Sequence, residues 1–271
     1  MPSDGHSRTV NALATTADGI IYCAAQSGLK RSVDLGRSWR NVGEAAPATV
    51  ICALDAACIL AATVGAVQIS EDAGASWQAR ALPSPSTIVS SLLATSESIL
   101  AATLEDGVLR SDDGGMSWRG WNFGLLSWRV NALCRDSAGI IWAATESGLF
   151  RSETDGRSWQ DQADFAQASI LSLDATAEGG LCLGTTEGAL QICGNPRAGK
   201  TLARQWQVPI NAICAIGERI AVLHGQTVSV SDGESGFEAL SYTDATSIKW
   251  LDEARLLIGT KYGLVHRIDL P

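Results

Sequence analysis

Charged residues and histidines are scarce in this chain of 271 residues: 18% of the residues are charged, and three are histidines. Its 20 lysines and arginines are outnumbered by 29 aspartates and glutamates, which gives a net charge of -9. Because a nucleic-acid-binding protein needs a basic face, this balance argues against a nucleic-acid partner. The few histidines leave little for a metal site, and no cofactor is expected.

Long apolar runs are also lacking. The hydrophobic stretches are short and interrupted, so no membrane span and no membrane partner are expected. The first ten residues, MPSDGHSRTV, hold no apolar core of a signal peptide. The cysteines form no C-x-x-C pair and sit mostly within apolar runs, which predicts small buried side chains in a reducing cytoplasm. They are Cys23, Cys52, Cys58, Cys134, Cys182, Cys193 and Cys214.

Internal repetition is the main positive signal. Val10-Asn11-Ala12-Leu13 opens one repeat, and Val130-Asn131-Ala132-Leu133 opens another almost identically. Both are followed by a second short apolar strand, a glycine and a third strand. A period of about 40 residues with short strands predicts β-propeller blades, whereas helical repeats need longer segments of period 3.6. The opening strands are predicted to end at Leu13, Leu54, Leu92, Leu133, Leu173, Ile213 and Trp250.

A boxed turn follows the third strand in the first four repeats. It reads S-x-D-x-G-x-S-W, in which an aspartate can accept hydrogen bonds from turn amides and a glycine can take a positive φ. In the fourth repeat, Thr154 stands where the aspartate belongs and Asp155 comes one place late. The box residues are Asp34, Gly36 and Trp39; Asp72, Gly74 and Trp77; Asp113, Gly115 and Trp118; and Gly156 and Trp159.

This motif resembles the Asp-box, or BNR, repeat of sialidases, sortilin-type receptors and photosystem-assembly-factor propellers. The resemblance implies an all-β fold, a seven-bladed β-propeller of four-stranded antiparallel blades. The sialidase catalytic set is incomplete: no Arg-Ile-Pro occurs, and Arg31, Arg110 and Arg151 recur at one structural position before the box. The motif therefore predicts the fold and says little about the reaction.

The seven repeats account for residues 1–271 as one domain, with blades starting near residues 10, 50, 89, 130, 170, 210 and 247. The later repeats lose the box. The seventh has no outer strand, so we expect its blade to have three strands, or to be completed by the N-terminal residues 1–8. Trimming those residues should melt the domain if they complete the ring.

Acidic residues recur in the loops between the second and third strands. In the resembled family, ligands meet the face that carries these loops, so Glu105, Asp106, Glu146 and Glu187 are candidate binding residues at a tunnel mouth. Lys261 and Tyr262 occupy the matching loop of the last repeat. Paired carboxylates can hydrolyse glycosides. The alternative interpretation is that they are solvated turn residues.

The loop after the third box is rich in aromatics. Trp121, Phe123 and Trp128 are additional to the box tryptophan, and Arg129 follows them. Tryptophan and arginine are enriched at interaction hot spots, although aromatics can also cover a blade edge. A second segment, residues 194–201, matches G-x-x-x-x-G-K-[ST] by letter but lacks the strand and long helix of a phosphate-binding loop.

The sequence therefore predicts a non-catalytic propeller that acts as an interaction scaffold or accessory subunit of a larger enzyme. Its predicted partner is a protein or enzyme subunit. The alternative is a carbohydrate-binding or glycoside-cleaving propeller, with a glycan as ligand.

Overall fold

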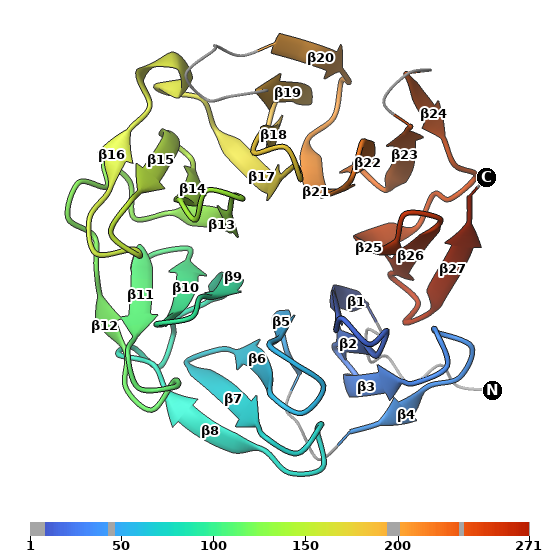
Figure 1. Cartoon of the computed structure of the whole chain (residues 1–271), viewed down its shortest axis with the longest axis horizontal. Coiled ribbons are helices and arrows are strands. Elements are labelled where there is room, and N and C mark those ends of the chain that lie inside the picture. Colours follow the sequence, from blue (N-terminus) through green and yellow to red (C-terminus); the bar gives the residue numbers. More distant parts are fainter. Residues whose placement is uncertain (1–8, 43–46, 194–200, 233–235, 271) are drawn as a thin grey trace.

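The computed structural model describes residues 9–42, 47–193, 201–232 and 236–270. Seven antiparallel sheets stand around a central axis like the blades of a propeller (Figure 1). Six sheets have four strands and the seventh has three. The prediction of a seven-bladed, all-β propeller is confirmed, including the three-stranded last blade.

Each blade runs in chain order from the innermost to the outermost strand. Blade 1 contains β1 (Val10–Thr15), β2 (Ile21–Ala25), β3 (Gly28–Ser32) and β4 (Arg40–Asn41). Blade 2 contains β5 (Val50–Ala53), β6 (Ile59–Thr63), β7 (Ala66–Ser70) and β8 (Gln78–Ala81). Blade 3 contains β9 (Val89–Ala94), β10 (Ile99–Thr103), β11 (Val108–Ser111) and β12 (Arg119–Gly120). Blade 4 contains β13 (Val130–Arg135), β14 (Ile141–Thr145), β15 (Gly148–Ser152) and β16 (Gln160–Asp161).

The 3-10 helix η1 (Ala163–Phe165) joins blade 4 to blade 5. Blade 5 contains β17 (Ile170–Ala175), β18 (Leu181–Thr185), β19 (Ala189–Cys193) and β20 (Thr201–Gln205). Blade 6 contains β21 (Ile210–Ile216), β22 (Arg219–His224), β23 (Thr227–Ser231) and β24 (Phe237–Ala239). Blade 7 contains β25 (Ala245–Asp252), β26 (Arg255–Thr260) and β27 (Val265–Asp269). None of these described elements is a helix long and apolar enough to cross a membrane.

The second strands form the centre of the packing. In blades 1 to 5, every residue of the second strand is buried, as in β6 and β10, which share the sequence ILAAT. A strand that is buried on both faces has no polar alternation, because each blade packs between two neighbours. This explains the apolar runs and the low charge of the sequence.

Two of the predicted strand anchors are wrong. The residues equivalent to Leu13 are Ile51 in blade 2 and Ile248 in blade 7, because each pairs with the central residue of its second strand. Leu54 lies beyond the short strand β5 and is 40% exposed. Trp250 lies two residues past the true anchor, on the long, bulged strand β25.

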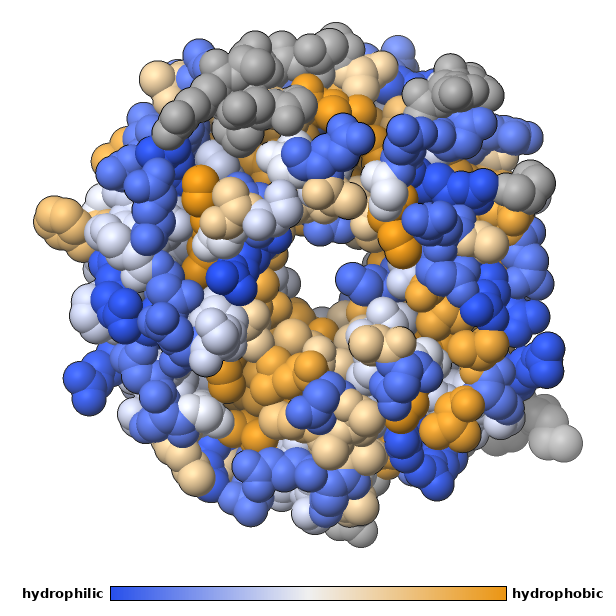
Figure 2. Space-filling view, in the orientation of Figure 1, coloured by the Kyte–Doolittle hydropathy of each residue, from blue (hydrophilic) through white to orange (hydrophobic). Residues whose placement is uncertain are grey.

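Hydrogen bonds link successive inner strands around the axis. Asn131 Nδ2 donates to the Ile170 carbonyl at 2.7 Å, and Ser90 Oγ donates to the Val130 carbonyl at 2.6 Å. The same kind of bond closes the ring, where Thr246 Oγ1 donates to the Val10 carbonyl at 2.6 Å. These first strands surround the opening visible in Figure 2. The predicted role of residues 1–8 in closure lies outside the described residues.

The cysteines pack within the blades. Five of the seven are buried, as predicted. Burial raises the pKa of the Cys23, Cys182 and Cys214 thiols to about 12. They are therefore neutral, unreactive thiols at ordinary pH.

Candidate functional site

The box turns of blades 1 to 3 share one hydrogen-bond pattern. In blade 2, the Asp72 carboxylate accepts bonds from the Ser76 amide at 2.8 Å and the Ser76 hydroxyl at 2.6 Å. Ser70 Oγ donates to the same carboxylate at 2.9 Å and accepts from the Gly74 amide at 2.8 Å. Asp34 and Asp113 repeat these contacts. The serine hydroxyls and amides lower the pKa of Asp72 and Asp113 to about 2.

In the fourth box, Thr154 and Asp155 have different roles. Thr154 takes the aspartate's place, because its hydroxyl accepts from the Ser158 amide at 2.9 Å. Asp155 turns to blade 3, where its carboxylate accepts from Arg110 Nη1 at 2.6 Å and Ser98 Oγ at 2.7 Å. The Arg110 side chain is fully buried. Asp155 is thus an interblade link, and Arg110 has the structural role that its repeat position predicted.

The box tryptophans each pack against the preceding blade. Trp159 is buried among residues of blade 3, and its indole N–H donates to the Trp121 carbonyl at 2.9 Å. Trp77 donates to the Val42 carbonyl of blade 1 at 3.3 Å. The box glycine allows this approach: a Cβ on Gly74, at φ +89°, would lie 2.9 Å from the Val42 Cβ. The boxes therefore hold blades together.

The predicted acidic residues lie in the loops between second and third strands. Glu105, Glu146 and Glu187 are exposed, and Asp106 is partly buried. The Asp106 carboxylate accepts from Thr87 Oγ1 at 2.5 Å, so it ties its loop to the preceding linker. These loops join the second and third strands, and in each blade the first strand is the innermost (Figure 1). Within the described part of the chain, no group of three or more acidic, cysteine or histidine side chains is placed to hold a metal ion.

Lys261 and Tyr262 lie in the turn between β26 and β27. The Lys261 ammonium forms an ion pair with Asp244, which raises the pKa of the lysine. It also lies 5.1 Å from the centre of the Tyr262 ring, whose side chain is 59% exposed. Most of the segment that resembles a phosphate-binding loop, residues 194–200, lies outside the described residues.

Hydrogen bonds and buried side chains hold the backbone of the aromatic linker between β12 and β13. Asn122 accepts from the Val108 amide at 2.8 Å and donates to the Asp106 carbonyl at 2.9 Å. Leu125 is buried in the core between blades 3 and 4, and Ser127 is buried too, with its hydroxyl 3.3 Å from Glu146. The Trp128 carbonyl accepts from the Gly107 amide at 2.9 Å. The linker is therefore held along its length.

The remaining side chains of this linker face the solvent. Phe123 is 81% exposed, Leu126 is 74% exposed and Trp128 is 60% exposed. We call these three side chains the linker patch. Arg129 beside them is exposed, whereas Trp121 is partly buried and uses its carbonyl to accept from Trp159. Sequence reasoning missed Leu126, although its alternation with the buried Leu125 and Ser127 was a signal.

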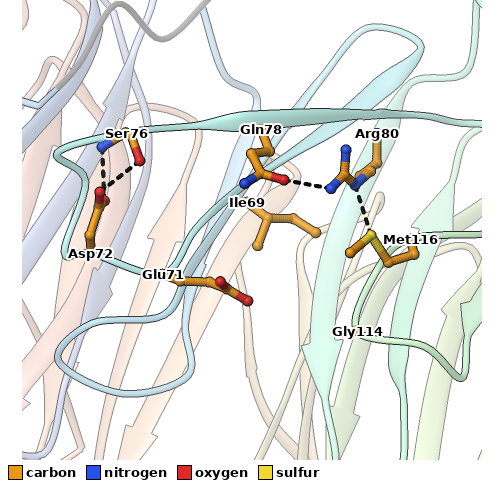
Figure 3. A pocket seen from close by; sticks show the side chains of 8 residues that line it. All are labelled: Ile69, Glu71, Asp72, Ser76, Gln78, Arg80, Gly114 and Met116. Atoms are coloured by element: carbon orange, nitrogen blue, oxygen red, sulfur yellow. Dashed lines mark hydrogen bonds between the residues drawn. The ribbon is translucent and has the colours of Figure 1, made fainter.

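A cavity of about 330 Å³ lies between the boxes of blades 2 and 3 (Figure 3). Glu71, Arg80 and Met116 line it, with Ile69 from β7. Arg80 is engaged there, since its guanidinium donates to Gln78 Oε1 at 2.5 Å and lies 3.1 Å from the Met116 sulfur. Asp72 and Ser76 also line the cavity but already bond each other within the box. The polar groups of this cavity thus mostly satisfy one another.

Comparisons with known proteins identify the fold. No family model and no curated protein matches the chain. The extracellular domain of the hybrid two-component system BT4673 from B. thetaiotaomicron superposes with a TM-score of 0.79 at 14% identity, over 97% of this chain and 38% of that one. This chain thus spans 38% of that structure's length. YCF48 bound to D1 peptide gives 0.73 at 14% identity, over 98% and 95% of the two chains. Virginiamycin B lyase from Staphylococcus aureus, with quinupristin, gives 0.81 at 9% identity, over 100% and 98%. Identities this low show that the chain shares the β-propeller fold with these proteins.

Proposed function

We propose that this chain is a non-catalytic Asp-box propeller that binds a partner protein through the linker patch, as a scaffold or accessory subunit of a larger assembly. The observation that carries the proposal is the exposure of Phe123, Leu126 and Trp128 on a linker whose backbone is fixed. Large apolar side chains lose hydration on contact with a partner, and a rigid loop loses little conformational entropy. Both effects favour association.

The surroundings of the patch support a protein partner. Arg129 and Glu146 lie beside it and give it a polar rim, which is the usual anatomy of a protein interface. YCF48, a propeller of similar shape, was solved with a bound peptide. Of the acidic loop residues, Glu146 contacts the linker through Ser127, and Asp106 contacts it through Asn122. Glu187, Lys261 and Tyr262 lie on other blades. A cytoplasmic location, expected from the cysteines, is part of the same proposal.

Site-specific photo-crosslinking tests this function. A benzoylphenylalanine in place of Leu126 should yield a defined protein adduct in cells of the source organism. The matched control carries the same group at Val64, which is 60% exposed on blade 2. The Phe123→Ser/Trp128→Ala double variant should abolish capture of the same protein, while Val64→Ser retains it.

Two results would overturn the proposal. One is an equal set of adducts from positions 126 and 64, which would mark the patch as an ordinary surface. The other is binding to a glycan array that the double variant loses, which would establish the carbohydrate-binding alternative.

A further inference from the structure

Blade 7 differs from the other six at its outer edge. Every other third strand pairs with a fourth, but in the described part of the chain β27 has no strand beyond it. Figure 1 shows β27 as the outermost strand of its blade. An open edge presents backbone N–H and C=O groups in the geometry that an additional strand needs.

A cavity lies beside the position where a box tryptophan of blade 7 would pack. Trp77 and Trp159 donate to the carbonyls of Val42 and Trp121, the residues that follow the outer strand of the preceding blade. Leu240 is their equivalent in blade 6: its amide donates to the Val228 carbonyl at 2.8 Å, as the Trp121 amide does to Val108 at 2.9 Å.

A cavity of about 240 Å³ opens beside Leu240. We call it the open slot; its apolar lining is Val230, Phe237, Leu240, Trp250 and Leu270.

The open edge also carries an arginine, Arg267, whose counterpart in blade 4 has a partner on the outer strand. Arg267 pairs across to Leu257 as Arg151 pairs across to Trp142, so the two arginines are equivalent. Arg151 is held by Glu153 at 2.8 Å and donates to Gln160 on the outer strand at 3.3 Å. Arg267 has the first contact, to Asp269 at 3.3 Å, and its Nη1 also donates to the Leu35 carbonyl of blade 1 at 3.4 Å. No described strand supplies a residue in the place of Gln160.

We propose that blade 7 accepts an extended segment of a partner protein as its fourth strand. The segment has a tryptophan that enters the open slot, followed directly by a glutamine or glutamate opposite Arg267. Blade 4 is the template, since Trp159 and Gln160 stand in this order there. Backbone pairing supplies affinity, and the tryptophan supplies specificity. This surface lies on another blade from the linker patch, so the inference does not rest on the proposed function.

A peptide copied from this chain tests the inference directly. The probe is RSWQDQA, residues 157–163, with a fluorescent label and titrated onto the full chain. Replacing the peptide's tryptophan with alanine should weaken binding about tenfold or more, as for an interface hot spot. Hydrogen exchange should slow at the β27 amides when the peptide is bound.

Substitutions in the protein locate the site. Val230→Phe fills the open slot and should abolish peptide binding, while its matched control Val64→Phe leaves it intact; thermal melting confirms that both variants fold. Arg267→Ala and a peptide glutamine-to-alanine change should be non-additive, because they remove the same contact. The linker variant Phe123→Ser/Trp128→Ala should bind the peptide normally, which separates this test from that of the proposed function.

Several outcomes would overturn the inference. The first is no binding, or equal binding of the tryptophan and alanine peptides. The second is binding that survives Val230→Phe. Binding that appears only after residues 1–8 are removed would assign the edge to the chain's own N-terminus. Self-association that the peptide competes away would assign it to a second copy of the chain.

Discussion

The junction between blades 3 and 4 and the junction between blades 7 and 1 hold neighbouring blades by different chemistry. At the first, the buried Arg110 guanidinium donates to the Asp155 carboxylate, and the Trp159 indole adds a second polar contact, to the Trp121 carbonyl. At the second, Thr246 bonds the Val10 carbonyl, and the Val10 side chain packs against Gly259. The internal junction thus uses a buried ion pair. The closing junction has no ion pair among the described residues and uses close packing and hydrogen bonds, one of them from the Arg267 guanidinium to the Leu35 carbonyl of blade 1 at 3.4 Å. The stability of the closing junction should therefore depend little on pH.

The largest expected effect comes from breaking the charged junction. Asp155→Ala leaves the buried Arg110 guanidinium with one charged partner, Asp112, which is 56% exposed, and with the backbone carbonyl of residue 155. We expect a loss of about 3 kcal/mol in unfolding free energy, the lower end for a broken buried pair because Asp155 is itself 20% exposed. Chemical denaturation measures this loss. Asp112→Ala is the control and should lose under about 1 kcal/mol; equal losses would contradict the assignment.

Acid should weaken the same junction. Burial raises the pKa of Asp155, but hydrogen bonds from Ser98 and Arg110 outweigh that effect and leave the pKa below its usual value. The ion pair therefore stabilises the fold above the unfolded-state pKa and is lost as pH falls through the folded-state pKa. The Asp155→Ala variant should show a smaller acid-induced loss of stability than the parent chain.

A smaller effect is expected at the closing junction. A Cβ at Gly259 would lie 2.5 Å from Val10 Cγ1 and 2.3 Å from Ser247 Oγ. Gly259→Ala should cost about 1–3 kcal/mol, as other overpacked cores do, and should speed hydrogen exchange in β1. Gly184→Ala crowds Ile210 at the same strand position of blade 5 and should spare β1. Equal rates of hydrogen exchange in β1 of both variants would show that the closing junction is no more sensitive to overpacking than other junctions.

The smallest effect concerns the exposed boxes. The pKa of both Asp72 and Asp113 is about 2 in the folded chain, below their pKa in the unfolded chain. Both carboxylates therefore stabilise the fold at pH values above the unfolded-state pKa, and this contribution is lost as the pH falls toward 2. A variant with Asn at both positions should have a flatter acid-stability profile. Thr154→Asp should add the same acid dependence to blade 4, and a profile unchanged in either variant would refute the role of these hydrogen bonds.

The repeat period predicted the architecture because each blade repeats one pattern of strands and turns. Sequence alone could not place Asp155, because its partner Arg110 lies 45 residues away on another blade. The anchors Leu54 and Trp250 were misplaced because β5 has four residues and β25 has eight, so equal spacing fails there. The acidic residues remain a prediction.

The linker was recognised by its aromatics, but their exposure depends on Asn122, which fixes the backbone through two hydrogen bonds to blade 3.

Each box tryptophan packs against the blade before its own, so it fills the interface between its own blade and the preceding one. Blade 7 has no box among its described residues, so its interface with blade 6 receives no box tryptophan. There Trp250 of blade 7 is buried instead, and its indole donates to the Cys214 carbonyl at 3.0 Å. The closing junction with blade 1 receives its own tryptophan, Trp39. The junction that closes the ring and the junction of blade 7 that receives no box tryptophan are thus two different places. A strand added beyond β27 would therefore lie away from the Thr246–Val10 hydrogen bond that closes the ring.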